Sequence, residues 1–178
     1  MTDTLVFHID DPDYSVRELR HPEDTESLQR LFERCTDYSM IVEGQGVSPS
    51  AAQETFEDVP PGRLRSDKFV YGLLDRNDDI VGVLEGIRHY PDELTWWIGL
   101  FLLSPETRGH GLGRKVIEGF IDYMRSEHVN SIMLGVVEEN RAAYDFWQRL
   151  GFEFVRKTEP RQFGRKTQSV YVMRRAVL

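Results

Sequence analysis

The alternation of hydrophobic and polar residues divides the chain into short strands and amphipathic helices. Three stretches repeat apolar residues at the helical spacing of about 3.6 residues. Their stripes are Leu28, Leu31, Phe32 and Cys35; Leu112, Val116, Ile117, Phe120, Ile121 and Met124; and Ala143, Phe146, Trp147 and Leu150. Residues 95–103 and 131–137 are instead almost continuously apolar, which is typical of strands covered on both faces.

The remaining pattern completes a mixed α/β order. Further strands are predicted at 14–20, 68–74, 80–89, 152–157 and 168–174. A further helix, the second in chain order, is predicted from residue 48 to the prolines at 60–61. Polar loops are predicted at 43–47 and 161–166. The order β-α-α-β-β-β-α-β-α-β-β predicts an α/β fold: a central mixed sheet of about seven strands flanked by about four helices. Residues 1–13 are ambiguous, because Leu5–Ile9 fits either an extra strand or a loose arm.

Length and composition favour one domain over residues 1–178. Hydrophobic residues make up 40% of the chain, which argues against disorder. No apolar run approaches the roughly 20 residues of a membrane helix, and the first residues lack the layout of a signal peptide. The single cysteine, Cys35, excludes an internal disulfide and fits a buried position in a reducing compartment. We therefore expect a cytoplasmic protein without a membrane partner.

The charge is acidic and uneven along the chain. The formal net charge is −8, which is poorly suited to binding nucleic acid. Residues 1–60 hold 4 basic and 14 acidic side chains, whereas residues 156–178 hold 7 basic and 1 acidic. A solvated acidic face explains this distribution, and so does an acidic entrance for a cationic molecule.

The most informative chemistry lies at residues 104–113, which read Ser-Pro-Glu-Thr-Arg-Gly-His-Gly-Leu-Gly. A strand runs here into a glycine-rich turn that begins a helix. The first N–H groups of a helix have no internal partner, and glycine lets the backbone approach a ligand, so this turn suits a phosphate or pyrophosphate. The spacing is neither that of a dinucleotide-binding turn nor that of a Walker turn. No histidine or cysteine pair has metal-ligand spacing, and we expect no metal.

Two motifs together resemble the GNAT family of N-acetyltransferases. Residues 108–113, Arg-Gly-His-Gly-Leu-Gly, fit the acetyl-CoA signature Gln/Arg-x-x-Gly-x-Gly/Ala of that family. Asn140 and Ala143, followed by an aromatic residue and by Gly151-Phe152, resemble its second motif. The element order is similar to that of the family from about residue 14 to residue 174. The resemblance implies a GNAT-like fold and transfer of an acetyl group from acetyl-CoA to a primary amine.

The resemblance also implies which residues bind acetyl-CoA. They are Phe101, Leu102, Leu103, Arg108, Gly109, His110, Gly111, Leu112, Gly113, Arg114, Asn140, Ala143 and Trp147. Phe101 and Leu103 would offer backbone groups to the pantetheine arm where their strand separates from residues 134–136. Gly99 marks either a bulge at that point or close packing. Arg108 would contact a phosphate, and Asn140 would cap the last helix as well as contact pantetheine.

The catalytic groups are less evident, because the chain departs from the family pattern. Trp147 occupies the place of the usual acid, a tyrosine, and an indole N–H cannot release its proton at neutral pH. Tyr144, about one helical turn before Trp147, is a candidate to act as the acid in its place. For the base we favour Glu85, because a carboxylate within an apolar strand needs a reason. The other candidates are Asp92, Glu93, Glu138 and Glu139, or a water chain to a more distant carboxylate.

The acceptor is expected to be a small cationic metabolite, because the first 60 residues are acidic. Two other functions stay open. One is an acyl-CoA-binding sensor without efficient catalysis, which Trp147 in the acid position favours. The other is a protein acetyltransferase acting on a lysine or an N-terminus. A homodimer is compatible with the chain, with residues 170–174 as a strand that pairs between two copies.

Overall fold

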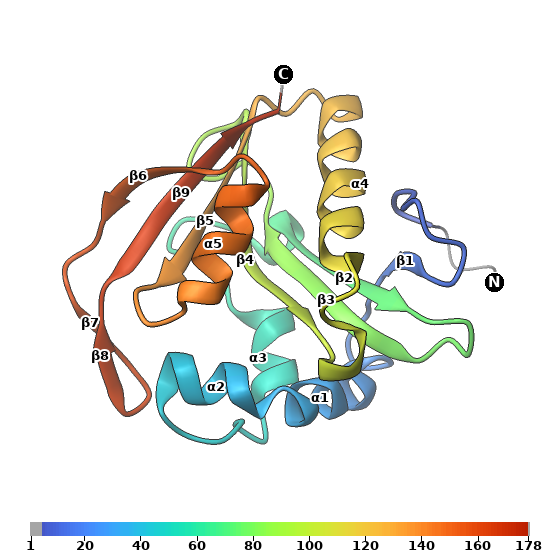
Figure 1. Ribbon diagram of the computed structural model, residues 1–178, viewed down its shortest axis with the longest axis horizontal. Coiled ribbons are helices and arrows are strands. Elements are labelled where there is room, and N and C mark those ends of the chain that lie inside the picture. Colours follow the sequence, from blue (N-terminus) through green and yellow to red (C-terminus); the bar gives the residue numbers. More distant parts are fainter. Residues whose placement is uncertain (1–4, 178) are drawn as a thin grey trace.

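The structure is a computed structural model that describes residues 5–177. Its centre is a seven-stranded mixed sheet with the strand order β1-β2-β3-β4-β5-β9-β6, and β7 and β8 form a separate hairpin (Figure 1). The strands are β1 (Ser15–Glu18), β2 (Lys68–Leu74), β3 (Ile80–Ile87), β4 (Thr95–Leu103), β5 (Ser131–Val137), β6 (Glu153–Lys157), β7 (Arg161–Phe163), β8 (Lys166–Gln168) and β9 (Val170–Ala176). The predicted α/β class, with a mixed sheet of seven strands, is confirmed.

Helices cover both faces of the sheet. They are α1 (Thr25–Arg34), α2 (Thr36–Glu43), α3 (Ala51–Glu57), α4 (Leu112–Ser126) and α5 (Arg141–Arg149), with 3₁₀ turns at Arg65–Asp67 and Pro105–Thr107. Side chains of α4 and α5 pack against one face, together with Phe69 and Tyr71 of β2. Helices α1 and α3 pack against the other face, together with Val70. Successive residues of one strand thus serve two different clusters, which follows from the two-residue period of a strand.

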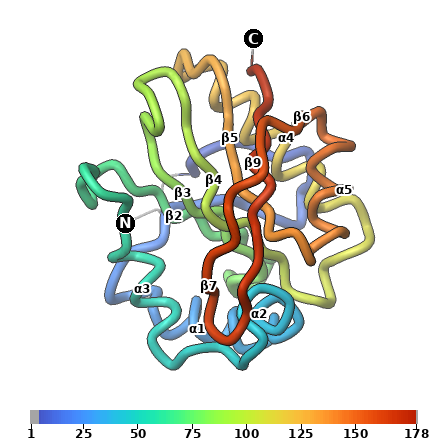
Figure 2. The backbone as a smooth tube through the Cα atoms, turned by 90° about the vertical axis from the view of Figure 1, so that its left-hand side faces the viewer, coloured from blue at the N-terminus to red at the C-terminus, as the bar shows by residue number. Residues whose placement is uncertain are grey.

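Two elements differ from the expectation. Helix α2, which accounts for the difference between the predicted four helices and the observed five, has no buried residue and hence no apolar stripe. The segment predicted as a polar loop at 161–166 belongs instead to the β7–β8 hairpin. The hairpin lies alongside α2 (Figure 2), and the N–H of Arg165 donates a hydrogen bond of 2.8 Å to the carbonyl of Glu43.

The last strand does not have the free edge that pairing between two copies requires. Strand β9 lies between β5 and β6 and is antiparallel to both. Its two edges are therefore occupied within one chain, and the expectation that residues 170–174 pair across a dimer is wrong. The edge strand on this side of the sheet is β6, which is exposed along its whole length and bulges between Phe154 and Arg156.

Strands β4 and β5 separate halfway along their length. They run parallel and pair from Thr95 opposite Ser131 to Ile98 opposite Leu134, and each continues beyond the last pair. On its other side, β4 pairs with β3, where Leu100 faces Glu85 and Ile98 faces Gly86. Gly99 is the extra residue of this bulge, so the bulge that Gly99 indicated is present and lies where the strands part.

The first described residues pack against the body of the sheet. The N–H of Val6 donates a hydrogen bond of 3.0 Å to the carbonyl of Val16, and Phe7 and Ile9 are buried in the cluster beneath α4. Residues 1–4 of the ambiguous segment lie outside the described part.

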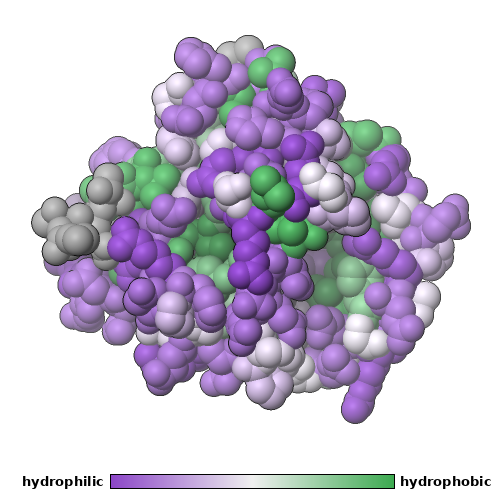
Figure 3. All heavy atoms as spheres, turned by 180° about the vertical axis from the view of Figure 1, so that it is seen from behind, coloured by the Kyte–Doolittle hydropathy of each residue, from purple (hydrophilic) through white to green (hydrophobic). Residues whose placement is uncertain are grey.

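None of the helices within residues 5–177 is long and apolar enough to cross a membrane. The face turned away from the viewer in Figure 1 is mostly hydrophilic (Figure 3).

Candidate active site

The separated strands open a cavity of about 650 Å³ between β4, β5 and the first turns of α4 and α5. Eleven of the thirteen residues expected to bind a cofactor line it, and they come from β4, from the turn before α4, and from α4 and α5 with its cap residue. These are Phe101, Leu102, Leu103, Arg108, Gly109, Gly111, Gly113, Arg114, Asn140, Ala143 and Trp147. The two motifs, which lie far apart in the sequence, therefore meet in one cavity.

The glycine turn forms one end of this cavity. Gly109 and Gly111 have φ angles of +81° and +82°, and nothing lies within 4 Å of the β-carbon that a larger residue would add at either position. Left-handed backbone of this kind favours glycine. Because Gly111 directly precedes α4, the free N–H groups of the helix start are close to open space. An anion at this position would gain both these donors and the positive end of the helix dipole.

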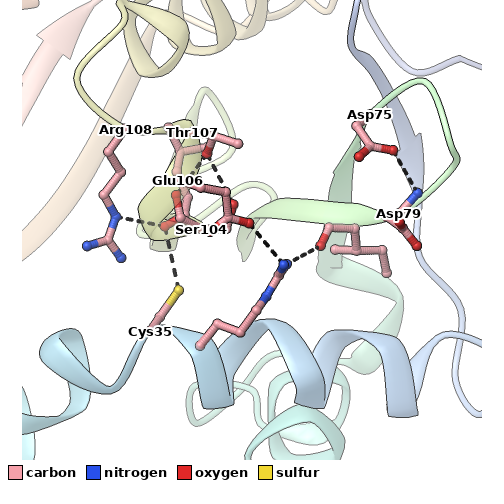
Figure 4. Close-up of polar contacts among 10 residues, drawn as sticks. Cys35, Asp75, Asp79, Ser104, Glu106, Thr107 and Arg108 are labelled. Carbon is pink, nitrogen blue, oxygen red and sulfur yellow. Dashed lines mark hydrogen bonds and ion pairs between the residues drawn. The ribbon is translucent and has the colours of Figure 1, made fainter.

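Arg108 is anchored at the entrance of the turn. Its Nε donates a hydrogen bond of 2.8 Å to the carbonyl of Leu103, and its Nη1 lies 2.6 Å from Asp37 of α2. The thiol of Cys35 points to the same carbonyl at 3.5 Å, and both side chains converge there in Figure 4. The Arg108 hydrogen bond holds the pKa of Asp37 below its usual value, whereas burial raises the pKa of Cys35.

Three of the expected residues are placed differently. The side chain of His110 is exposed and that of Leu112 is buried in the core, so neither lines the cavity, although their N–H groups belong to the turn. Tyr144 stacks edge-on against Tyr171, with 5.3 Å between ring centroids, and it lines neither this cavity nor the second one described below. Tyr144 is therefore a poor substitute for the acid.

Asn140 and Trp147 have clear structural roles. The Oδ1 of Asn140 accepts a hydrogen bond of 3.2 Å from the N–H of Ala143, which confirms the expected helix cap. The indole of Trp147 is buried and packs against three rings, those of Phe101, Phe146 and Phe152, at centroid distances of 5.9, 5.0 and 5.1 Å. Trp147 thus forms an aromatic wall of the cavity.

A second cavity of about 720 Å³ lies between α1, α2, α3 and the bulged part of the sheet. Four carboxylates line it, those of Glu43, Glu54, Asp58 and Glu85, against the cations Lys68 and Arg161. The excess of carboxylates favours a cationic molecule in this space.

Glu85 forms a buried ion pair at the floor of the second cavity. Its Oε1 lies 2.9 Å from the Nζ of Lys68, and only 13% and 7% of the two side chains are exposed. Burial raises the pKa of Glu85, and the ammonium of Lys68 opposes that shift. The bulge makes room for the carboxylate, because a β-carbon on Gly99 would lie 2.8 Å from Glu85 Oε2.

Three of the other carboxylates considered as a base form ion pairs or hydrogen bonds outside the two cavities. Glu138 pairs with Lys157 at 2.9 Å, and Glu139 pairs with Lys166 at 2.5 Å. Asp92 accepts a hydrogen bond from the N–H of Leu94 in the turn before β4. None of these carboxylates, nor Glu93, lines either cavity. Among the carboxylates proposed from the sequence as the base, Glu85 alone combines a cavity position with a raised pKa.

The two cavities meet across β4. They share the lining residues Tyr38, Val42, Gly99, Leu100 and Leu102. Helix α2 therefore stands between them and contributes Asp37 and Ile41 to the first cavity as well. Asp37 and Ile41 could not be identified from the sequence, because α2 carries no motif and no apolar stripe.

Comparisons with known proteins agree with this geometry. Residues 13–152 match the acetyltransferase (GNAT) family. The chain is 38% identical over 64 residues to N-alpha-acetyltransferase 30 of Saccharomyces cerevisiae, covering 36% of each chain. It is 33% identical over 92 residues to mycothiol acetyltransferase of Saccharopolyspora erythraea, covering 52% of this chain and 29% of that protein. The chain thus spans about a third of the length of the curated relatives it matches.

A solved structure is similar over nearly the whole fold. The crystal structure of an acetyltransferase from Thermus thermophilus has a TM-score of 0.74 and 21% identity, covering 92% of this chain and 97% of that one. At this level of identity the similarity concerns the arrangement of helices and strands.

Proposed function

Because the chain belongs to the acetyltransferase (GNAT) family, we propose that it transfers the acetyl group of acetyl-CoA to a primary amine of a small cationic metabolite. One observation carries the proposal. The cavity that contains the glycine turn and the cavity that contains the carboxylates meet at Gly99 and Leu100 of β4. A donor in the first and an acceptor in the second would meet where the strand bulges.

The first cavity fits coenzyme A in both shape and chemistry. The turn at Gly109 and Gly111 leaves open space beside the start of α4, which suits a pyrophosphate. Beyond Ile98, the β5-facing edge of β4 has no strand partner. Apart from the carbonyl of Leu103, which accepts a hydrogen bond from Arg108, its backbone groups are available to the amides of the pantetheine arm. Acetyl-CoA bound there would supply an activated thioester carbonyl.

The second cavity fits an acceptor with positive charge. Glu43, Glu54 and Asp58 line it beyond the buried ion pair of Glu85 and Lys68. Carboxylates concentrate ammonium ions in a cleft of low dielectric. The amine would then lie with one end at Gly99 and with its remaining charge near these three carboxylates.

Glu85 is the residue that removes a proton from the amine in this proposal. A primary alkylammonium has a pKa of about 10.4 and cannot attack until it is deprotonated. Burial raises the pKa of Glu85, which brings it closer to that of the ammonium and makes the carboxylate a stronger base. Lys68 keeps the carboxylate ionised, and Trp97, which lines the same cavity, excludes water from one side.

The test is amine-dependent release of the coenzyme A thiol. A primary diamine and the amino alcohol of equal length form a matched pair of acceptors that differ in one charge. We expect the diamine to have the higher kcat/KM, and Glu85→Gln to lower it by about 10²- to 10⁴-fold, as for loss of a general base. If no amine accelerates thiol release, the proposed activity is wrong.

A second candidate function is acetylation of a protein N-terminus. Its support is the similarity to N-alpha-acetyltransferase 30 over 64 residues. Peptides with a free N-terminus belong in the same assay, and a peptide that outperforms every small amine would favour this candidate. The sensor hypothesis predicts a third result, in which acetyl-CoA binds and no amine is acetylated.

A further inference from the structure

One side chain stands at the point where the two cavities meet and can donate a hydrogen bond there. Of the five residues that line both cavities, Val42, Gly99, Leu100 and Leu102 have no polar side-chain atom, and the fifth is Tyr38. Tyr38 is half-buried and lies in the first turn of α2. Within residues 5–177, its hydroxyl has no hydrogen-bond partner. The hydroxyl is therefore available to a molecule in the cavities.

Three other donors near the cavities are committed or misplaced. Trp147 is enclosed by aromatic rings, and Tyr144 packs on Tyr171 outside both cavities. The thiol of Cys35 is directed at the carbonyl of Leu103. The sulfur of a bound thioester would thus find no other side-chain hydroxyl at the junction of the cavities.

We propose that the hydroxyl of Tyr38 donates a hydrogen bond to the sulfur atom that leaves acyl-CoA during transfer. The proposal rests on the proposed function, because it concerns the same pair of cavities. It assigns a catalytic role to a residue that lies outside both sequence motifs. It also explains how Trp147 can stand at the usual position of the acid, because the hydrogen-bond donor to the sulfur comes from α2 and not from α5.

Tyr38 keeps its proton because its hydroxyl is a weaker acid than the leaving thiol. Burial, together with the charges of Glu85 and Glu43, raises the pKa of Tyr38 to about 12. A thiol has a pKa of about 8.5. Full transfer of the proton from the hydroxyl to the departing sulfur is therefore unfavourable, whereas a hydrogen bond to a thiolate is favourable.

The bonds balance without a proton from Tyr38. As the acceptor nitrogen bonds to the acyl carbon, the carbon–sulfur bond breaks and its electron pair stays on sulfur. Glu85 first releases to solvent the proton that it took from the ammonium, and then accepts the second proton, which the nitrogen loses as the amide forms. The thiolate, held by the hydrogen bond from Tyr38, takes a proton from water after release.

The acidity of coenzyme A bound to the enzyme measures this hydrogen bond without turnover. A donor to the thiolate lowers the pKa of the thiol, and the ultraviolet absorbance of the thiolate follows it. The other charges around the site act equally in the wild-type protein and in Tyr38→Phe. The charged residues that line the two cavities are Asp37, Glu43, Glu54, Asp58, Lys68, Glu85, Arg108, Arg114, Arg149 and Arg161.

The comparison uses three proteins saturated with coenzyme A. We expect Tyr38→Phe to raise the pKa of the bound thiol by about one unit, a tenfold change in its ionisation constant. Tyr14→Phe is the control, because Tyr14 packs against the main core cluster and lines neither cavity. Below the thiol pKa, calorimetry should give equal coenzyme A affinities for all three within about twofold, and their melting temperatures should agree.

The possible results separate the two proposals. An unchanged thiol pKa in Tyr38→Phe, with normal coenzyme A binding, overturns the role of Tyr38 and leaves the proposed function intact. Tyr144→Phe is measured as a fourth protein, and a shift of the thiol pKa there in place of Tyr38→Phe overturns the role of Tyr38 in favour of Tyr144 of α5. Failure of the wild-type protein to bind coenzyme A overturns both proposals.

Discussion

Replacing Gly111 with alanine tests whether the turn before α4 holds the anionic part of the cofactor. The residue has a φ angle of +82° and no atom within 4 Å of the added β-carbon, so the substitution causes no clash. Left-handed backbone costs a residue with a β-carbon about 1–2 kcal/mol. The reduced freedom of the unfolded chain returns about 0.4–1 kcal/mol. A net loss of about 1 kcal/mol lowers the melting temperature by about 2–4 °C in a chain of this size.

Gly62 provides a matched control. Its φ angle is +81°, its β-carbon position is equally open, and it lines neither cavity. Gly62→Ala and Gly111→Ala should therefore lose similar stability without ligand. The two variants should differ only when the cofactor is present, because the methyl group at position 111 occupies the space through which a phosphate approaches the helix.

The assay is a thermal-shift titration with acetyl-CoA. A ligand at about 100 times its dissociation constant stabilises the native state by about 2.7 kcal/mol, and a tenfold weaker affinity removes about 1.4 kcal/mol of that effect. We expect Gly62→Ala to retain the full stabilisation and Gly111→Ala to lose at least this amount. Equal stabilisation of both variants would refute the assignment of the turn as the anion site.

Three further predictions concern the acceptor cavity and the last helix. Lys68→Met removes the ammonium that keeps Glu85 ionised, so we expect the pKa of Glu85 to rise. The acidic limb of the profile of kcat/KM against pH should then move to higher pH. An unmoved limb would show that Glu85 is not the base. Asn140→Ala should lower the free energy of unfolding by about 1 kcal/mol in a denaturant titration, since it removes a helix cap, and a change below about 0.3 kcal/mol would contradict the cap. The KM of a cationic acceptor should rise with salt in initial-rate measurements because ions screen the carboxylates, whereas a flat response would count against charge recognition.

The elements that could be predicted from the sequence are those with a strong periodic pattern of hydrophobic residues. The stripe from Leu112 to Met124 is buried along α4 as expected, since each of its members faces the sheet. The two motifs lie about 30 residues apart in the sequence, and their residues Arg108 and Asn140 line the same cavity. A glycine in an apolar strand, Gly99, pointed to the bulge.

The parts that were missed depend on long-range contacts. Helix α2 is supported by hydrogen bonds from the side chain of Gln168 to the carbonyls of Ile41 and Val42, at 3.2 and 2.8 Å. Such contacts between residues more than 120 positions apart leave no local pattern. The pairing of Lys68 with Glu85 has the same origin, because the register of β2 and β3 makes them diagonal neighbours. Tyr38, on the same helix, could not be identified from the sequence for that reason.

The most direct test of the account is the fate of acetyl-CoA when a diamine is added to the purified protein. The account predicts that free coenzyme A thiol and the monoacetylated diamine appear in equal amounts, that both require the protein, and that Glu85→Gln suppresses both together. Acetyl-CoA that binds but stays intact with every amine would contradict the account, and would identify the cavity as a binding site without chemistry.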